Sequence, residues 1–157
     1  TALMMGVGGG HTEAVKALLQ GGAKANVKTN NGATALMQAS SSGHVEVVKA
    51  LLEGGSKVDT KTKDGTTALM VATGEGHAEV VKALLEGGAE VNAKGAGGWT
   101  ALIQASSKGH VKIVNALLAK GADPAAVTDD GWTAMRMALG GGHSTIIDSL
   151  RDAGATR

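Results

Sequence analysis

The sequence predicts an all-α solenoid, in which small helix–turn–helix units stack side by side. The segment of residues 34–61 returns almost intact 33 residues later, and again 33 residues after that. Threonines and glycine–histidine pairs recur at the same constant spacing of 33 residues. These markers are Thr1, Thr34, Thr67, Thr100 and Thr133, with Gly10-His11, Gly43-His44, Gly76-His77, Gly109-His110 and Gly142-His143. A fixed period of this length is typical of units that bury their apolar faces only against their neighbours.

Each unit is expected to contain two helices. Apolar residues recur at helical spacings in two runs, which the segment 42–44 separates in the second unit. In that unit they are Leu36, Ala39, Val47, Val48, Leu51 and Leu52. The hydroxyl of Thr34 can cap the first helix, whose initial N–H groups lack partners inside the helix. Gly54 and Gly55 give the freedom that ends the second helix, and the polar segment 56–66 suits a projecting turn.

Three blocks of sequence together carry a family resemblance. Thr-Ala-Leu-Met-x-Ala is followed by Gly-His-x-Glu-Val-Val-Lys-Ala-Leu-Leu and then by Gly-Gly-Ala-x-Val-Asn. This pattern resembles the ankyrin repeat along the whole chain. The resemblance implies helix pairs stacked side by side, with β-turn fingers at right angles to them. It also implies a single domain, residues 1–157, with repeats at about 1–33, 34–66, 67–99, 100–132 and 133–157.

The chain departs from the family pattern at the start of its repeats, where Thr-Pro-Leu-His becomes Thr-Ala-Leu-Met or a close variant. Alanine replaces a proline that is pre-set for the first helical turn, but alanine is itself a good helix former, so we expect little loss of stability. Without the histidine, Met37, Met70 and Ile103 are expected to form an apolar column between repeats. Because methionine is flexible, we expect looser packing there.

The first repeat is expected to be weak. Gly6 and the glycines at 8–10 lower the helix propensity of its first segment, so we expect a frayed helix or further repeats upstream. Met4, Met5 and Val7 would face outward if nothing precedes them, whereas terminal repeats normally carry a polar outer face.

The last repeat is expected to be a C-terminal cap and thus the true end of an array. Polar groups replace apolar ones at Arg136, Asp148, Arg151 and Asp152. Arg151 stands where the other repeats have the second leucine of a pair, and a charge there suits a face on which no further repeat stacks.

Composition excludes several classes of function. With 15 basic and 14 acidic residues among 157, the formal charge is +1, so we expect neither nucleic acid nor a membrane as partner. The absence of cysteine excludes disulfides, thiolate catalysis and zinc fingers. No apolar run approaches about 18 residues, and the N-terminus lacks a secretory signal pattern. We favour an intracellular location.

We expect no catalytic, cofactor-binding or metal-binding residues, and therefore no enzyme. The five histidines are equivalent in successive repeats, and helices packed about 8–10 Å apart hold them too far apart to share a metal bound at about 2 Å. Each histidine is expected to order its own inter-helix turn. The serines lack a repeating Ser-His-acid arrangement, and the glycine clusters lack the Lys-Ser/Thr of a phosphate-binding loop.

Surface recognition is the remaining class of function. Stacking aligns the variable positions of each repeat into columns on one concave face, formed by the fingers and the exposed sides of the first helices. The candidate partner-binding residues are Lys63, Thr66, Trp99, Asp129 and Trp132 in the fingers, with Gln38, Ser41, Ser42, Val71, Glu75, Gln104, Ser107 and Lys108 on the first helices.

Trp99 and Trp132 are the expected anchors, since they lie one repeat apart and tryptophan is enriched among binding hot spots. The alternative is that each ring only packs over the neighbouring finger. We interpret the chain as a monomeric, non-catalytic module that binds another protein. Two other interpretations stay open: a spacer that carries an effector or enzymatic domain outside this segment, and an engineered, consensus-like binding scaffold.

Overall fold

The computed structural model describes residues 1–155, and within them the chain forms ten α-helices in five successive pairs. The helices are α1 (Ala2–Gly8), α2 (Thr12–Gln20), α3 (Ala35–Ser42), α4 (Val45–Glu53), α5 (Ala68–Glu75), α6 (Ala78–Glu86), α7 (Ala101–Lys108), α8 (Val111–Ala119), α9 (Ala134–Gly141) and α10 (Ser144–Asp152). One turn of 3₁₀ helix, η1 (Ala96–Gly98), precedes α7. The fifth repeat was expected to span residues 133–157, and its last two residues, 156 and 157, lie outside the described part.

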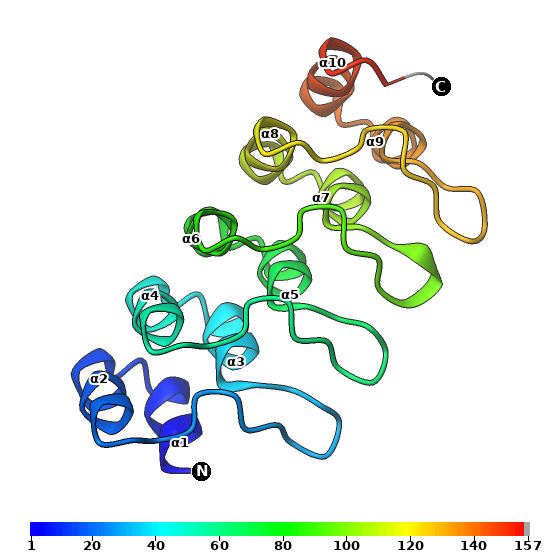
Figure 1. Cartoon of the computed structure of the whole chain (residues 1–157). Helices are drawn as coiled ribbons and strands as arrows, with labels where there is room; N and C mark the ends of the chain where they lie inside the picture. Colours follow the sequence, from blue (N-terminus) through cyan, green and yellow to red (C-terminus); the bar gives the residue numbers. More distant parts are fainter. Residues whose placement is uncertain (156–157) are drawn as a thin grey trace.

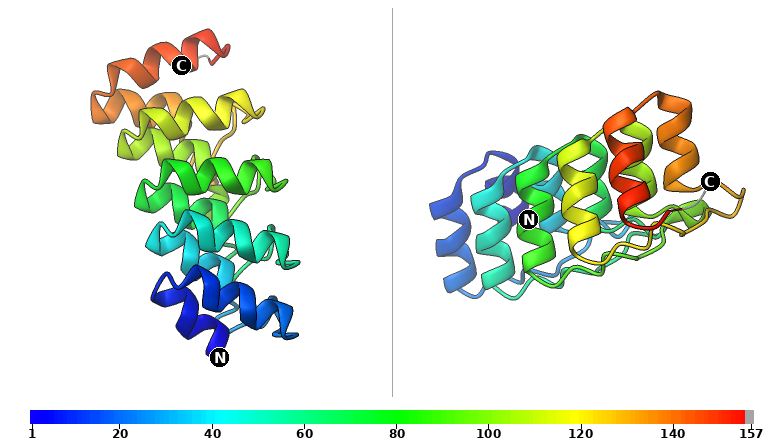
Figure 2. Two further views of the ribbon diagram at one scale, coloured as in Figure 1. Left: turned by 90° about the vertical axis from the view of Figure 1, so that its left-hand side faces the viewer. Right: turned by 90° about the horizontal axis from the view of Figure 1, so that it is seen from above.

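The helices form two layers along one axis. Odd-numbered helices make one layer and even-numbered helices the other, and the termini lie at opposite ends of the stack (Figures 1 and 2). The loops that follow α2, α4, α6 and α8 project beyond the odd-numbered layer (Figure 1). We call them finger 1 (residues 24–33), finger 2 (57–66), finger 3 (90–99) and finger 4 (123–132). The predicted all-α solenoid is confirmed.

Threonine caps begin the odd-numbered helices, as predicted. The Thr34 hydroxyl accepts a hydrogen bond from the Met37 N–H at 3.3 Å, and equivalent bonds start α1, α5, α7 and α9. The helix α3 ends at Gly43, whose φ of 73° is left-handed and suits glycine. Each repeat thus fixes the two ends of its first helix by local sequence.

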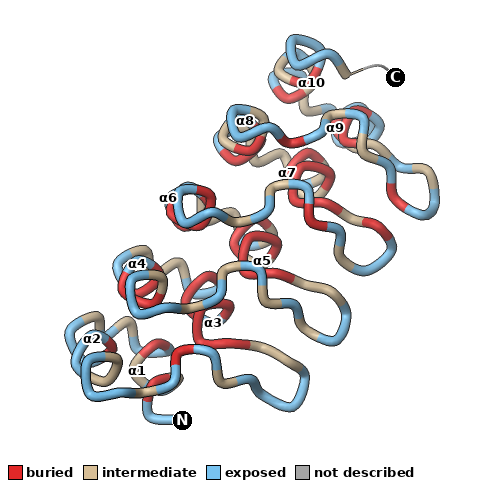
Figure 3. The backbone as a smooth tube through the Cα atoms, viewed as in Figure 1, coloured by how far each residue is buried: buried red, intermediate tan, exposed pale blue. Residues whose placement is uncertain are grey.

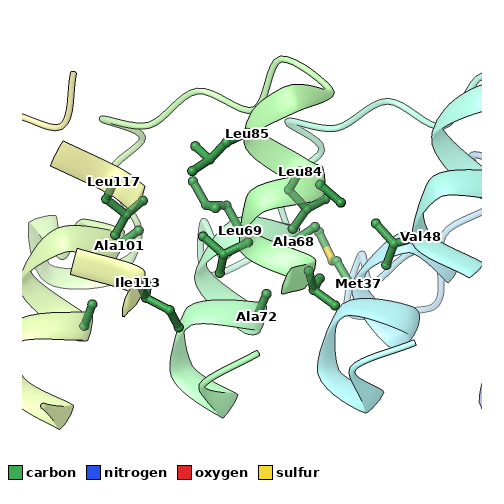
Figure 4. Close-up of a cluster of buried hydrophobic side chains, with 14 of the residues drawn as sticks. Met37, Val48, Ala68, Leu69, Ala72, Leu84, Leu85, Ala101, Ile113 and Leu117 are labelled. Carbon is green, nitrogen blue, oxygen red and sulfur yellow. The ribbon is translucent and has the colours of Figure 1, made fainter. Parts of the chain in front are cut away.

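The core lies between the two helix layers and between neighbouring pairs (Figure 3). Leucines, valines and isoleucines from all five pairs form one continuous buried cluster, part of which Figure 4 shows. Met37, Met70 and Ile103 are all buried, as expected of an apolar column. Because helix pairs bury their faces against each other, the stability of each repeat depends on its neighbours.

One expectation about the first repeat needs correction. Val7 is fully buried in the helix α1 rather than outward-facing, while Met5 is exposed as expected. Gly8 also has a packing role, because a Cβ there would lie 2.8 Å from the Gln38 side-chain nitrogen. The glycines that lower helix propensity therefore also let the second repeat approach closely.

The expected role of the histidines was wrong for two of them. The His77 Nε2 atom lies 2.9 Å from the carbonyl oxygen of Ser41, and His143 Nε2 lies 3.3 Å from that of Ser107. Both carbonyls belong to the preceding helix pair, so these side chains join repeats instead of ordering their own turn. The reason is that each ring lies beside the left-handed glycine of the previous repeat, where a Cβ would collide with it.

Candidate partner-binding site

Residues of α5, α7 and fingers 2 and 3 line an open hollow of about 340 Å³. We call it the hollow. Six predicted partner-binding residues line it: Thr66, Val71, Glu75, Trp99, Gln104 and Lys108. The other lining residues, Met70, Gly74, Gly95, Ala96 and Thr100, were not among the predicted partner-binding residues. Three of these five are glycine or alanine, whose contribution is the space they leave rather than a side chain.

The helix α5 positions the polar side chains of α7 in the hollow. A Cβ on Gly74 would lie 2.7 Å from the Gln104 side-chain nitrogen, so this glycine makes room for the amide. The Lys108 ammonium donates a hydrogen bond to the Gly74 carbonyl at 2.9 Å. Gln104 and Lys108 therefore lean toward the preceding repeat, and the backbone of α5 fixes where their polar groups lie.

Trp99 forms a wall of the hollow at its finger end. It is half-buried, it packs against the hydrophobic core, and it directly precedes Thr100, the cap of α7. The exposed Glu75 and Lys108 lie at the last residues of α5 and α7. The hollow therefore combines an aromatic wall, an amide and one charge of each sign.

Trp132 is in a different environment from Trp99, although the sequence treats the two as equivalent. Its side chain is 42% exposed, and the Arg136 guanidinium carbon lies 4.9 Å from the ring centroid. The Arg136 Nη1 group also donates to the Gly131 carbonyl at 2.9 Å. A cation over an indole face is attracted by the ring quadrupole. Arg136, expected only as a polar capping residue, thus holds the Trp132 ring at the surface.

The remaining predicted residues lie outside the hollow. Gln38, Ser41 and Ser42 are exposed on α3, Ser107 is half-buried on α7, and Lys63 and Asp129 are exposed in fingers 2 and 4. The backbones of Lys63 and Asp129 also tie neighbouring fingers together, since their N–H groups donate to Asn31 and Gly97 carbonyls at 3.1 and 2.9 Å. These residues extend the candidate surface along the array.

The two tryptophans are expected to differ in their effect on stability. Trp99→Ala removes a half-buried ring from the core, so we expect the free energy of unfolding to fall by about 1 to 2 kcal/mol. Trp132→Ala removes an exposed ring and is expected to change it by less than about 1 kcal/mol. Urea denaturation followed by circular dichroism measures both. Equal losses would contradict the different environments described above.

Within the described part of the chain, no three histidine, cysteine or acidic residues gather as metal ligands would. None of the helices in residues 1–155 has the length and apolar character that a membrane crossing needs. The lining of the hollow suits non-covalent recognition, through one carboxylate, one ammonium, an amide and an aromatic ring.

The stacked helix pairs with their projecting fingers define a helical repeat solenoid. A family model described as "Ankyrin repeats (3 copies)" matches residues 1–62, 54–128 and 94–156. The chain belongs to the ankyrin-repeat family, whose members are generally protein–protein interaction modules and typically not catalysts. A comparison with curated proteins found no match.

Proposed function

We propose that this chain binds another protein through the face formed by its fingers and odd-numbered helices, with the hollow at the centre of the contact. The chain acts as one domain of five repeats, residues 1–157, and as a monomer without catalytic activity of its own. The observation that carries this proposal is the hollow itself, where Trp99 meets polar groups from α5 and α7.

The chemistry of this face supports recognition of a protein segment. Aromatic residues in partly desolvated pockets supply much of the binding energy at protein interfaces, while polar residues around them fix orientation. Trp132, whose indole is exposed one finger away, extends the aromatic surface beyond the hollow. The near balance of 15 basic and 14 acidic residues gives no comparable reason to expect nucleic acid.

Selection from a displayed library of random 12-residue peptides tests the proposal. Peptides that bind the 157-residue chain are expected to weaken about tenfold, or about 1.4 kcal/mol, when Gln104 or Glu75 is changed to alanine, measured by calorimetric titration. Matched changes on the outer, even-numbered layer, Lys82→Ala and Glu86→Ala, are expected to alter affinity less than twofold.

Two results would overturn the proposal. In the first, the affinity of the selected peptides falls on Lys82→Ala and Glu86→Ala but not on Gln104→Ala or Glu75→Ala, which would place recognition on the outer layer. Failure to select any binder would favour the spacer role instead.

A further inference from the structure

At three junctions between neighbouring helix pairs, two fingers also lie next to each other, so the hydrogen bonds of these junctions can be compared at equivalent positions. The first joins the second and third pairs, and the last joins the fourth and fifth. Between them, α5, α6 and finger 2 meet α7, α8 and finger 3, and we call this contact the seam. At equivalent positions, the seam lacks several inter-repeat hydrogen bonds that the two flanking junctions have.

At the seam, neighbouring fingers are not joined by a hydrogen bond between two backbone groups. The Lys61 ammonium does donate to the Lys94 carbonyl across the seam at 3.2 Å, as Lys94 does to Val127 at the last junction. The Lys63 N–H donates to Asn31 and the Asp129 N–H to Gly97 at the flanking junctions. Among residues 1–155, the equivalent Ala96 N–H makes no such bond to the carbonyl of Asp64.

The sequence of finger 3 explains this loss. In fingers 2 and 4, the hydroxyls of Thr62 and Thr128 accept backbone bonds at 3.1 and 3.0 Å and so hold the finger closed. Finger 3 has Gly95 at this position, and its backbone forms the turn η1, in which Gly97 takes a positive φ of 63°, unlike the equivalent Asp64 and Asp130 in fingers 2 and 4. Finger 3 therefore lacks the hydroxyl clamp and differs from its neighbours in the backbone at Gly97, although the same two backbone bonds close it, from the Gly95 N–H to Trp99 and from the Gly98 N–H to Gly95.

A second set of bonds, at the bases of the fingers, is halved at the seam. The Asn26 side chain donates to the Gly55 carbonyl at 2.9 Å and accepts from the Lys57 N–H at 2.7 Å. Asn92 repeats this pattern with the Gly121 carbonyl at 3.1 Å and the Asp123 N–H at 2.8 Å.

The residue at this position in the seam is Asp59. Its carboxylate accepts from the Glu90 N–H at 2.8 Å. An ionised carboxylate cannot donate, so the Gly88 carbonyl, equivalent to those of Gly55 and Gly121, receives no bond from Asp59.

The histidine link between helix pairs is also missing. His77 and His143 reach the carbonyls of Ser41 and Ser107 at the flanking junctions. The His110 Nε2 atom is buried without a hydrogen-bond partner among the described residues. The carbonyl at the equivalent position is that of Gly74, and the Lys108 ammonium occupies it at 2.9 Å.

Packing at the seam is open on both layers. Besides the hollow, a cavity of about 200 Å³ lies between α6 and α8, lined by Leu85, Ala116 and Lys120 among others. An equivalent cavity of about 270 Å³ lies between α2 and α4, so this opening is not particular to the seam. Another, of about 240 Å³, adjoins His110 at the start of α8. Lys120 stands where the preceding repeats have Gly54 and Gly87, each closely approached by a leucine of the helix pair before it.

We infer that the seam is a hinge, at which helices α1–α6 and α7–α10 move as two bodies. Fewer inter-repeat hydrogen bonds lower the free energy needed to open this junction, because each repeat is held only by its neighbours. The hollow lies in the seam, so hinge motion changes its width. The link to partner binding rests on the proposed function, whereas the hinge itself is a property of the free chain.

Native-state amide hydrogen exchange on the free 157-residue chain tests the hinge. Asp59→Asn supplies the missing donor to Gly88, so we expect the opening that exposes finger 3 and the start of α7 to become roughly fivefold rarer, as for one added hydrogen bond. Asn92→Asp removes the equivalent donor at a flanking junction, and there opening should become roughly fivefold more frequent. Asp64→Asn is the matched control, because it makes the same charge change in finger 2 away from this position.

The hinge is supported if Asp59→Asn slows exchange at the seam and Asp64→Asn does not. It is overturned if Asp59→Asn and Asp64→Asn slow amide exchange at the seam to the same extent. It is also overturned if the seam of the unchanged chain exchanges as slowly as the flanking junctions do. Because no partner takes part, this outcome is independent of the peptide selection, and either proposal can fail while the other stands.

Discussion

Replacing Leu84 with alanine is expected to lower the free energy of unfolding by about 2 to 5 kcal/mol, the range found when a buried leucine is truncated. Leu84 is fully buried in α6, within the cluster of Figure 4. Since repeats contact only their neighbours, weakening the third pair also weakens the link between the two ends of the array. Urea denaturation followed by circular dichroism is expected to show an earlier and broader transition.

Leu139→Ala is the matched control for this change. Leu139 is 48% exposed on α9, so its truncation leaves little cavity and is expected to cost less than about 1 kcal/mol. Similar losses for the two leucines would mean that the buried cluster does not hold the repeats together as described.

Replacing Gly43 with alanine is expected to cost about 2 to 3 kcal/mol. Its φ of 73° is a left-handed conformation that costs an alanine about 1 to 2 kcal/mol. A Cβ there would also lie 2.8 Å from ring atoms of His77. The ring would have to move and would lose its bond to the Ser41 carbonyl, for about 1 kcal/mol more.

Gly55→Ala separates the backbone cost from the collision. Gly55 has a φ of 85°, and nothing lies within 4 Å of a Cβ built there. We therefore expect it to lose only about 1 to 2 kcal/mol. A double change of Gly43→Ala with His77→Ala should lose less than the sum of the two single changes, because the ring and the methyl group compete for one space.

The sequence predicts most of the fold because its signals are local. Thr34 and its equivalents cap the odd-numbered helices as expected, and the periodic leucines Leu36 and Leu51 are fully buried. The sequence does not show what neighbouring repeats do to each other. Gly8 looks like a helix breaker in the sequence, yet its place beside Gln38 is a packing requirement that only the stacked structure shows.

The candidate site was predicted in part. Six of its lining residues follow from the column argument, because stacking places equivalent positions on one face. The difference between Trp99 and Trp132 was missed, since it depends on where the Arg136 side chain lies. The seam is visible in the sequence, because its finger has an aspartate, Asp59, at the position where the flanking junctions have the asparagines Asn26 and Asn92. The meaning of this difference depends on the partner carbonyl, which the sequence alone does not show.

The positions of the two indoles give the chain an optical reporter of its own. Trp99 and Trp132 are its only aromatic side chains apart from the histidines, and both belong to fingers that form part of the proposed binding surface. Intrinsic fluorescence therefore reports on the C-terminal half of the array, while melting of α1 to α4 is nearly silent in emission. A ligand that covers Trp99 should shift its emission to the blue, and no attached dye is needed to see it.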